Sequence, residues 1–312
     1  MYNISYKYKG LLLLLFKIVI IVAALYFIYQ KLVFNESLSF SQFQNQFSIV
    51  FTKNIWFLVF ILLLTDANWL LEIYKWKILA SVEKKISFLD AFEQCLASLT
   101  ASIITPNRIG EYGVKALYFE KKIRKKIVLL NLIGNLSQLL ATLVFGILGF
   151  AIIWSSFNFE IPTLNIQNIL IGVIILLILF VIWKQLNLNK IRTYLKQIPS
   201  KLYFKLIGIA FLRYLIFSHQ FYFLTVLFGV ETDYYLVISI IFSIYLMASI
   251  LPTLAIFDWV IKGSIAILLF SFIEMNELAV LTVTTLMWIL NIGIPSILGT
   301  IFILNFKMID SE

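Results

Sequence analysis

The sequence TPNRIGEYGVK, residues Thr105–Lys115, places a proline, two glycines, two basic residues and one acid inside a strongly apolar chain. A charged residue at the centre of a membrane costs roughly 2.5–3.5 kcal/mol on insertion scales. Backbone that Pro106 and Gly110 interrupt is tolerated at that depth only where it lines protein or water. We therefore expect this stretch to line a polar cavity within the membrane.

The composition indicates a membrane protein. The 312-residue chain has 62% hydrophobic residues, 13% charged residues and a mean hydropathy of +0.97. Such a chain is predicted to be an all-α, polytopic membrane protein with one membrane domain over residues 1–312. It has room for about six to eight spans of ~20 residues each, and no soluble catalytic domain fits in the remainder. The net charge of +9 does not indicate nucleic-acid binding, because the basic residues cluster in short loops between apolar runs.

The loop charges orient the chain. Basic loops face the cytoplasm and loops with mostly acidic residues face outward, which places both termini in the cytoplasm. This assignment of loops predicts two broken helical hairpins that enter the membrane from opposite sides. Residues 88–119 enter from the cytoplasm, and residues 234–273 enter from outside. Their lengths allow either re-entrant or just-spanning hairpins. The expected full spans are residues 11–29, 54–79, 127–154, 169–183, 206–228 and 278–304.

The two hairpins share a sequence pattern, in which a proline is followed by an acid, an aromatic residue and a lysine four positions after the acid. We therefore predict an inverted repeat of residues 54–154 and 206–304, joined by a linker span within 155–205. Inverted repeats with broken helices are typical of transporters, whose substrate sites lie at the repeat interface. The matching residues are Pro106, Glu111 and Lys115 in the first hairpin, and Pro252, Asp258 and Lys262 in the second.

The motif TPNRIGEY resembles the hallmark of the lysylphosphatidylglycerol synthase transmembrane family, a flippase-like domain. Where the family pattern has Glu, Gly and Arg, this chain has Asp258, Val260 and Lys262. The resemblance extends over about residues 50–304 and implies the lipid-translocating module without the soluble aminoacyl-transfer domain, because the chain stops at Glu312. Further similar stretches are DANWLLEIYKW at 66–76, Pro252 with Asp258 to Gly263, and Trp288 with Asn291 and Pro295.

The helix breaks are assigned to Pro106, Gly110 and Pro252, and a new helix is expected to start near Ile109 or Glu111. The unpaired amides of a helix N-terminus attract anions, and an arginine beside them binds a phosphate through two hydrogen bonds. An acid four residues from a lysine lies on the same helical face. Such a pair either holds a zwitterionic or aminoacylated headgroup or forms an intrahelical salt bridge. The expected headgroup-binding residues are Asn107, Arg108, Glu111, Lys115, Asp258 and Lys262.

Other polar residues lie within the expected spans. Asp66 and Arg213 occupy equivalent helices of the two repeats and are predicted to pair across the repeat axis, as a structural tie or a gate, with the tie favoured. His219 is interpreted as a hydrogen-bonded histidine in preference to a proton-coupling group. Additional cavity-lining residues are expected to be Asn68, Glu72, Asn135, Gln138, His219, Gln220 and Asn291.

We therefore expect a non-enzymatic, flippase-like transporter that moves a polar-headgroup (phospho)lipid across the cytoplasmic membrane. Its expected partners are membrane lipids, with no nucleic acid, cofactor or metal. The sequence leaves open whether it forms a homo-oligomer or binds an envelope-biosynthesis partner.

One alternative is an integral-membrane transferase on a lipid-linked substrate, with Glu111 or Asp258 as its base. The chain has one His, one Cys and no Gly-rich phosphate loop, which disfavours an enzyme. The other alternative is a non-transporting subunit of an envelope-synthesis complex.

Overall fold

The computed structural model describes residue 26 and residues 55–103, 105, 108–157, 189–251 and 253–306. Every regular element in these ranges is a helix, which confirms the all-α class for this part of the chain. The expected span 169–183 and all of 11–29 except Tyr26 lie outside the described residues. Pro106, Asn107 and Pro252 lie outside them as well.

The helices of the described residues include five stretches that are long and apolar enough to cross a membrane. Four of them coincide with the expected spans 54–79, 127–154, 206–228 and 278–304. The fifth, Ala255–Ile273, is the second half of the expected hairpin 234–273.

The elements are α3 (Ile55–Ala80), α4 (Phe88–Ile103), α5 (Ile109–Leu117), α6 (Arg124–Phe157), α8 (Asn189–Gln197), α9 (Ser200–Leu227), α10 (Tyr234–Ile250), η1 (Ala255–Phe257), α11 (Asp258–Phe270), η2 (Ser271–Ile273), α12 (Glu277–Trp288), η3 (Ile289–Gly293) and α13 (Ile294–Leu304).

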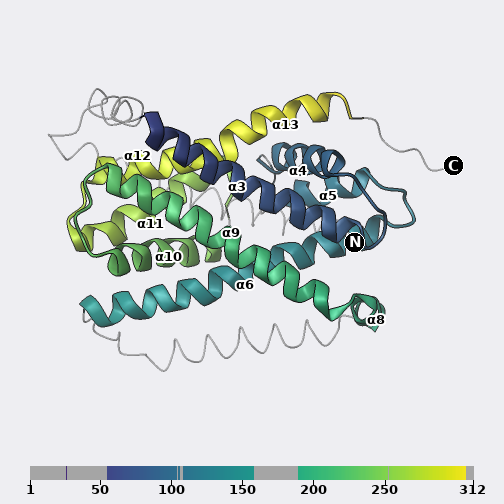
Figure 1. Cartoon of the computed structure of the whole chain (residues 1–312), viewed down its shortest axis with the longest axis horizontal. Helices are drawn as coiled ribbons and strands as arrows, with labels where there is room; N and C mark the ends of the chain where they lie inside the picture. The colour runs from purple at the N-terminus through teal and green to yellow at the C-terminus, as the bar shows by residue number, and fades with distance from the viewer. Residues whose placement is uncertain are drawn as a thin grey trace, which may run out of the picture.

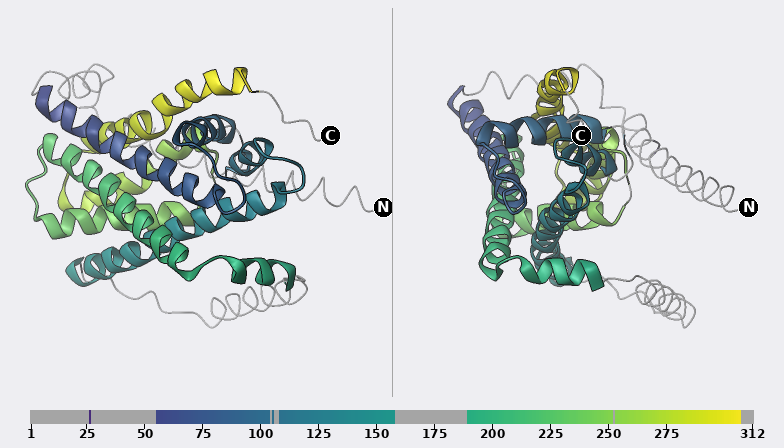
Figure 2. Two further views of the ribbon diagram at one scale, coloured as in Figure 1. Left: turned by 45° about the vertical axis from the view of Figure 1, so that its right-hand side comes forward. Right: turned by 90° about the vertical axis from the view of Figure 1, so that its right-hand side faces the viewer.

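The two expected hairpins, residues 88–119 and 234–273, are called the interrupted segments below. They lie at opposite ends of the long helices (Figure 1). α4 and α5 lie at the end where α3 finishes and α6 begins. α10 and α11 lie at the other end, where α9 finishes and α12 begins. A view along the long helices shows these elements arranged around a common centre (Figure 2). Polar residues on the inward faces of these helices therefore point toward the same central region.

The first interrupted segment resumes as a helix where the sequence predicts, at Ile109. Gly110 is the second residue of α5 and does not break a helix, which corrects that part of the prediction. A Cβ atom at Gly110 would lie 2.5 Å from the carbonyl oxygen of Ala101. The backbone N–H of Gly110 also donates a hydrogen bond to Thr105 Oγ1 at 2.9 Å. Gly110 therefore allows α5 to approach the end of α4 closely.

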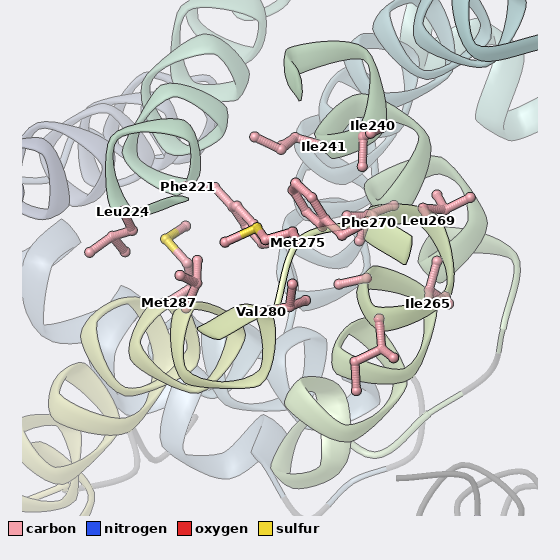
Figure 3. Close-up of a cluster of buried hydrophobic side chains, with 14 of the residues drawn as sticks. Phe221, Leu224, Ile240, Ile241, Ile265, Leu269, Phe270, Met275, Val280 and Met287 are labelled. Atoms are coloured by element: carbon pink, nitrogen blue, oxygen red, sulfur yellow. The ribbon is translucent and has the colours of Figure 1, made fainter. Parts of the chain in front are cut away.

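Two apolar clusters hold the interrupted segments in place. The larger cluster packs α9, α10, α11 and α12 together (Figure 3). In it, the rings of Phe221 and Phe270 stack with their centroids 6.1 Å apart. The second cluster contains Trp76 of α3 and Phe119 after α5, whose rings meet edge to face. Each cluster buries apolar side chains beside one of the two interrupted segments.

Small residues allow close packing between helices that are far apart in the sequence. At Gly299 of α13, a Cβ atom would lie 2.2 Å from the carbonyl oxygen of Leu96 on α4. Beside it, Thr100 Oγ1 donates a hydrogen bond to the carbonyl oxygen of Ser296 at 2.7 Å. Small residues at such contacts are the usual means by which helices associate closely in membranes. The first interrupted segment is thus packed directly against the last helix of the described chain.

Substitution of Gly299 by alanine is expected to destabilise the protein, because the added methyl group must displace backbone of α4. Overpacking of this kind costs about 1–3 kcal/mol. The matched control is Gly208→Ala on α9, where nothing lies within 4 Å of the added Cβ atom. Thermal unfolding in detergent should show a lower midpoint for Gly299→Ala and an equal or higher one for Gly208→Ala. Equal midpoints for the two variants would contradict the close contact.

Candidate functional site

A cavity of about 550 Å³ lies at the centre of the described helices. Residues of α3 to α6 and of α9 to α12 contribute to its wall, so both interrupted segments face it. Its charged lining residues come from four helices and from Arg108 just before α5, in a protein whose outer surface is rich in apolar side chains. The charged and amide residues that line it are Asn68, Glu72, Arg108, Glu111, Lys115, Asn135, Gln138, Arg213, Asp258, Lys262 and Asn291.

The cavity brings together most of the residues that the sequence analysis singled out. Five of the six expected headgroup-binding residues line it, and Asn107 is outside the described residues. Of the expected additional lining residues, His219 and Gln220 are not in its wall. His219 instead contacts the carbonyl oxygen of Leu215 and the hydroxyl of Tyr234. That arrangement matches the interpretation of His219 as a hydrogen-bonded histidine.

Glu111 and Lys115 form an intrahelical ion pair on α5. Lys115 Nζ lies 2.8 Å from Glu111 Oε1 and 2.9 Å from Asn131 Oδ1. The same ammonium group lies 4.4 Å from the ring centroid of Trp76, within range of a cation–π interaction. The Lys115 side chain is only 2% exposed. Its contacts therefore stabilise a buried cation and attach α5 to α6 and α3.

Asp258 and Lys262 form the corresponding pair on α11, with Lys262 Nζ 2.6 Å from Asp258 Oδ2. Lys262 also lies 5.3 Å from the ring centroid of Tyr245 on α10. This pair is more open than the pair on α5, since the Lys262 side chain is 29% exposed. The two pairs form as the spacing of four residues predicts, and each lies within a single helix.

Arg213 binds Glu72 and Asn68 of α3, which corrects the prediction that it pairs with Asp66. Its Nη1 lies 2.6 Å from Glu72 Oε2, and its Nε donates to Asn68 Oδ1 at 2.8 Å. Asn68 and Glu72 are four residues apart and share one helical face. Asp66 is six residues before Glu72, which turns it about 120° away, and its side chain is exposed. Helical periodicity alone therefore distinguishes the two acids.

Lys75 is a member of this cluster that the sequence analysis did not identify. Its ammonium nitrogen lies 2.7 Å from Glu72 Oε2, and the residue is buried. The Glu72 carboxylate thus forms ion pairs with two cations, Lys75 and Arg213. The signal was present in the sequence, because Glu72 and Lys75 are three residues apart on one helical face.

A line of side-chain amides connects α3, α9 and η3. Asn68 Nδ2 donates to Asn291 Oδ1 at 2.8 Å, and Asn291 Nδ2 donates to Gln220 Oε1 at 2.9 Å. Gln220 Nε2 continues the line by donating to Thr65 Oγ1 at 2.6 Å. Asn291 lies in the π-helical turn η3, a type of turn that is frequent at functional sites. The network links the two halves of the chain beside the cavity.

Arg108 differs from the other cations of the cavity. Its backbone has φ 56° and ψ 31°, the left-handed conformation that non-glycine residues rarely adopt. The residue is exposed and lines the cavity. No described residue forms a hydrogen bond or an ion pair with its guanidinium. Backbone conformations of this kind cost of order 1–3 kcal/mol and cluster at functional sites.

The described residues contain no group of three or more His, Cys, Asp or Glu suited to hold a metal ion. No family model matches the chain, and no curated protein or solved structure matches it either. The resemblance to the lysylphosphatidylglycerol synthase transmembrane family therefore depends on the motif residues alone and stays a prediction.

Replacing Glu72 by glutamine is expected to destabilise the fold, because Lys75 and Arg213 would lose their shared carboxylate. Removing one partner of a buried ion pair costs about 3–5 kcal/mol. The control is Asp66→Asn, which removes an acid from an exposed position of the same helix. Thermal unfolding in detergent should show a large decrease for Glu72→Gln and almost none for Asp66→Asn. The reverse order would favour the pairing of Asp66 with Arg213.

Proposed function

We propose that this protein is a flippase-like transporter that moves a polar-headgroup lipid across the cytoplasmic membrane. The observation that carries the proposal is the single cavity in which charged residues of both interrupted segments meet. Moving a lipid headgroup through hydrocarbon requires polar groups that replace its hydration. A wall with seven charged side chains, inside a chain with five candidate spans, supplies such groups.

In this proposal the headgroup enters the cavity while the acyl chains stay in the bilayer. The interrupted segments lie at opposite ends of the long helices (Figure 1), and residues of both segments line the one cavity. We further propose that residues 54–154 and 206–304 are inverted repeats, with cytoplasmic termini as the loop charges predict. α5 and α11, each with an acid and a lysine four residues apart, would then be equivalent elements.

The transferase alternative receives less support. It requires a carboxylate that accepts a proton from the substrate, and the candidates are Glu111 and Asp258. Both carboxylates are bound to lysines at 2.8 and 2.6 Å. A carboxylate held by a lysine at that distance accepts a proton from a substrate only after this contact is broken. The two ion pairs are therefore better suited to stabilise a polar cavity than to supply a general base for group transfer.

A bulky residue in the cavity is expected to stop transport without unfolding the protein. Ser249→Trp introduces an indole at an exposed position in the cavity wall. The matched control is Ser155→Trp, at an exposed position near the end of α6 that does not line the cavity. Purified protein is reconstituted into vesicles with lipids labelled on an acyl chain, and the label exposed on each leaflet is measured over time.

Wild type and Ser155→Trp are expected to move label several-fold faster than empty vesicles, and Ser249→Trp at the rate of empty vesicles. Circular dichroism and elution volume confirm that both variants are folded. Equal rates for wild type, both variants and empty vesicles, over lipids of several headgroups, would eliminate transport and favour the non-transporting subunit.

A further inference from the structure

The charges in the cavity wall do not balance. Among the described residues, four cations and three carboxylates line the cavity. The carboxylates of Glu72, Glu111 and Asp258 each lie between 2.6 and 2.8 Å from a cationic nitrogen. Lys75, behind the wall, adds a further positive charge to Glu72. The cavity therefore has a surplus of positive charge, and Arg108 is the lining cation that forms no ion pair with a described carboxylate.

Arg108 is well placed to bind an anion. Its guanidinium carries five N–H donors in a planar fork that matches two oxygens of a phosphate. Because the guanidinium is exposed to the cavity and has no ion-pair partner among the described residues, an incoming anion displaces no existing contact. The left-handed backbone of Arg108 adds strain, which a purely structural residue such as glycine would avoid. Position, charge and strain together indicate a ligand at this residue.

The acids of the cavity are poorly placed to bind an ammonium group. The Glu72, Glu111 and Asp258 side chains are 12%, 12% and 18% exposed, and each already contacts a cation at 2.6–2.8 Å. An incoming ammonium group would have to displace a lysine or arginine from a carboxylate and would meet like charge beside it. Two lining residues, Trp69 and Gln138, carry side-chain N–H groups that have no hydrogen-bond acceptor among the described residues.

We propose that the cavity selects a lipid headgroup with a net negative phosphate and no ammonium group. This inference rests on the proposed lipid transport and narrows it, because the ion pairs were first interpreted as sites for zwitterionic or aminoacylated headgroups. Arg108 binds the phosphate oxygens, and Lys262, the more exposed of the two lysines in the wall, faces the same cavity while paired with Asp258. The shared chemistry is that of a phosphate ester anion, which a soluble phosphate compound also presents.

A binding measurement tests the selectivity independently of transport. Three tryptophans line the cavity, so their fluorescence in detergent reports on ligands. The ligands are short-chain phosphatidylglycerol, phosphatidylethanolamine and a lysyl ester of phosphatidylglycerol, with glycerol phosphate as the soluble form. We expect phosphatidylglycerol to bind at least about tenfold more tightly than any other, as one charge-assisted hydrogen bond corresponds to that ratio.

Variants at Arg108 assign the selectivity to that residue. Arg108→Gly is expected to fold at least as stably as wild type, since glycine adopts a positive φ freely. It should lose the tenfold preference, and Arg108→Lys should keep part of it, because lysine retains the charge without the planar fork. The control Lys201→Gln removes an exposed cation outside the cavity and should leave binding unchanged. The same ligands and variants are then compared for transport in vesicles.

Each outcome has a distinct meaning. The inference is overturned if either ammonium-bearing lipid binds as well as phosphatidylglycerol, or if Arg108→Gly retains the preference. It is also overturned, in favour of a soluble phosphate compound, if glycerol phosphate binds as tightly as phosphatidylglycerol. Selective binding without movement of any lipid supports the inference and refutes the proposed transport. Transport of all headgroups at equal rates supports the proposed function and refutes the selectivity.

Discussion

Charge inside a low-dielectric environment must be compensated, and this constraint organises the centre of the protein. Glu72 shows it most directly, because one buried carboxylate lies within 2.7 Å of both Lys75 and Arg213. The ion pair with Arg213 fixes α3 against α9, and the amide of Asn68 extends the contact to η3. Asn68, Glu72 and Arg213, which line the cavity, therefore also hold its walls together, since each of them bonds to a partner on another helix.

Local features of the sequence predicted the parts of this arrangement that depend on helical periodicity. The long apolar runs predicted α3, α6, α9 and α12 to α13, and the pairs on α5 and α11 followed from a spacing of four residues. The same rule places Asn68 and Glu72 on one face of α3, with Asp66 on another, and Arg213 bonds to the first face. The choice of Asp66 relied on its position near the middle of a span and ignored its helical face.

Contacts between distant segments were beyond any local rule. Gly110 was assigned to a helix break because glycine is common at breaks, whereas its role is a close approach to Ala101. Only the packing of α5 on α4 distinguishes these roles. The bond between Asn68 and Asn291 joins residues 223 positions apart, and its geometry depends on the π-helical turn at Asn291. No pattern in the sequence specifies that extra residue per turn.

The ion pairs of the cavity differ in what they connect, and this difference has a mechanical consequence. Asp258 and Lys262 both belong to α11, so a displacement of that helix would carry the pair along intact. Glu72 and Arg213 belong to different helices, so separating α3 from α9 would leave a charge uncompensated. α3 and α9 therefore form the rigid part of the cavity wall. α11 is held differently, because its own ion pair is internal and its apolar side chains pack into the larger cluster with α10 and α12.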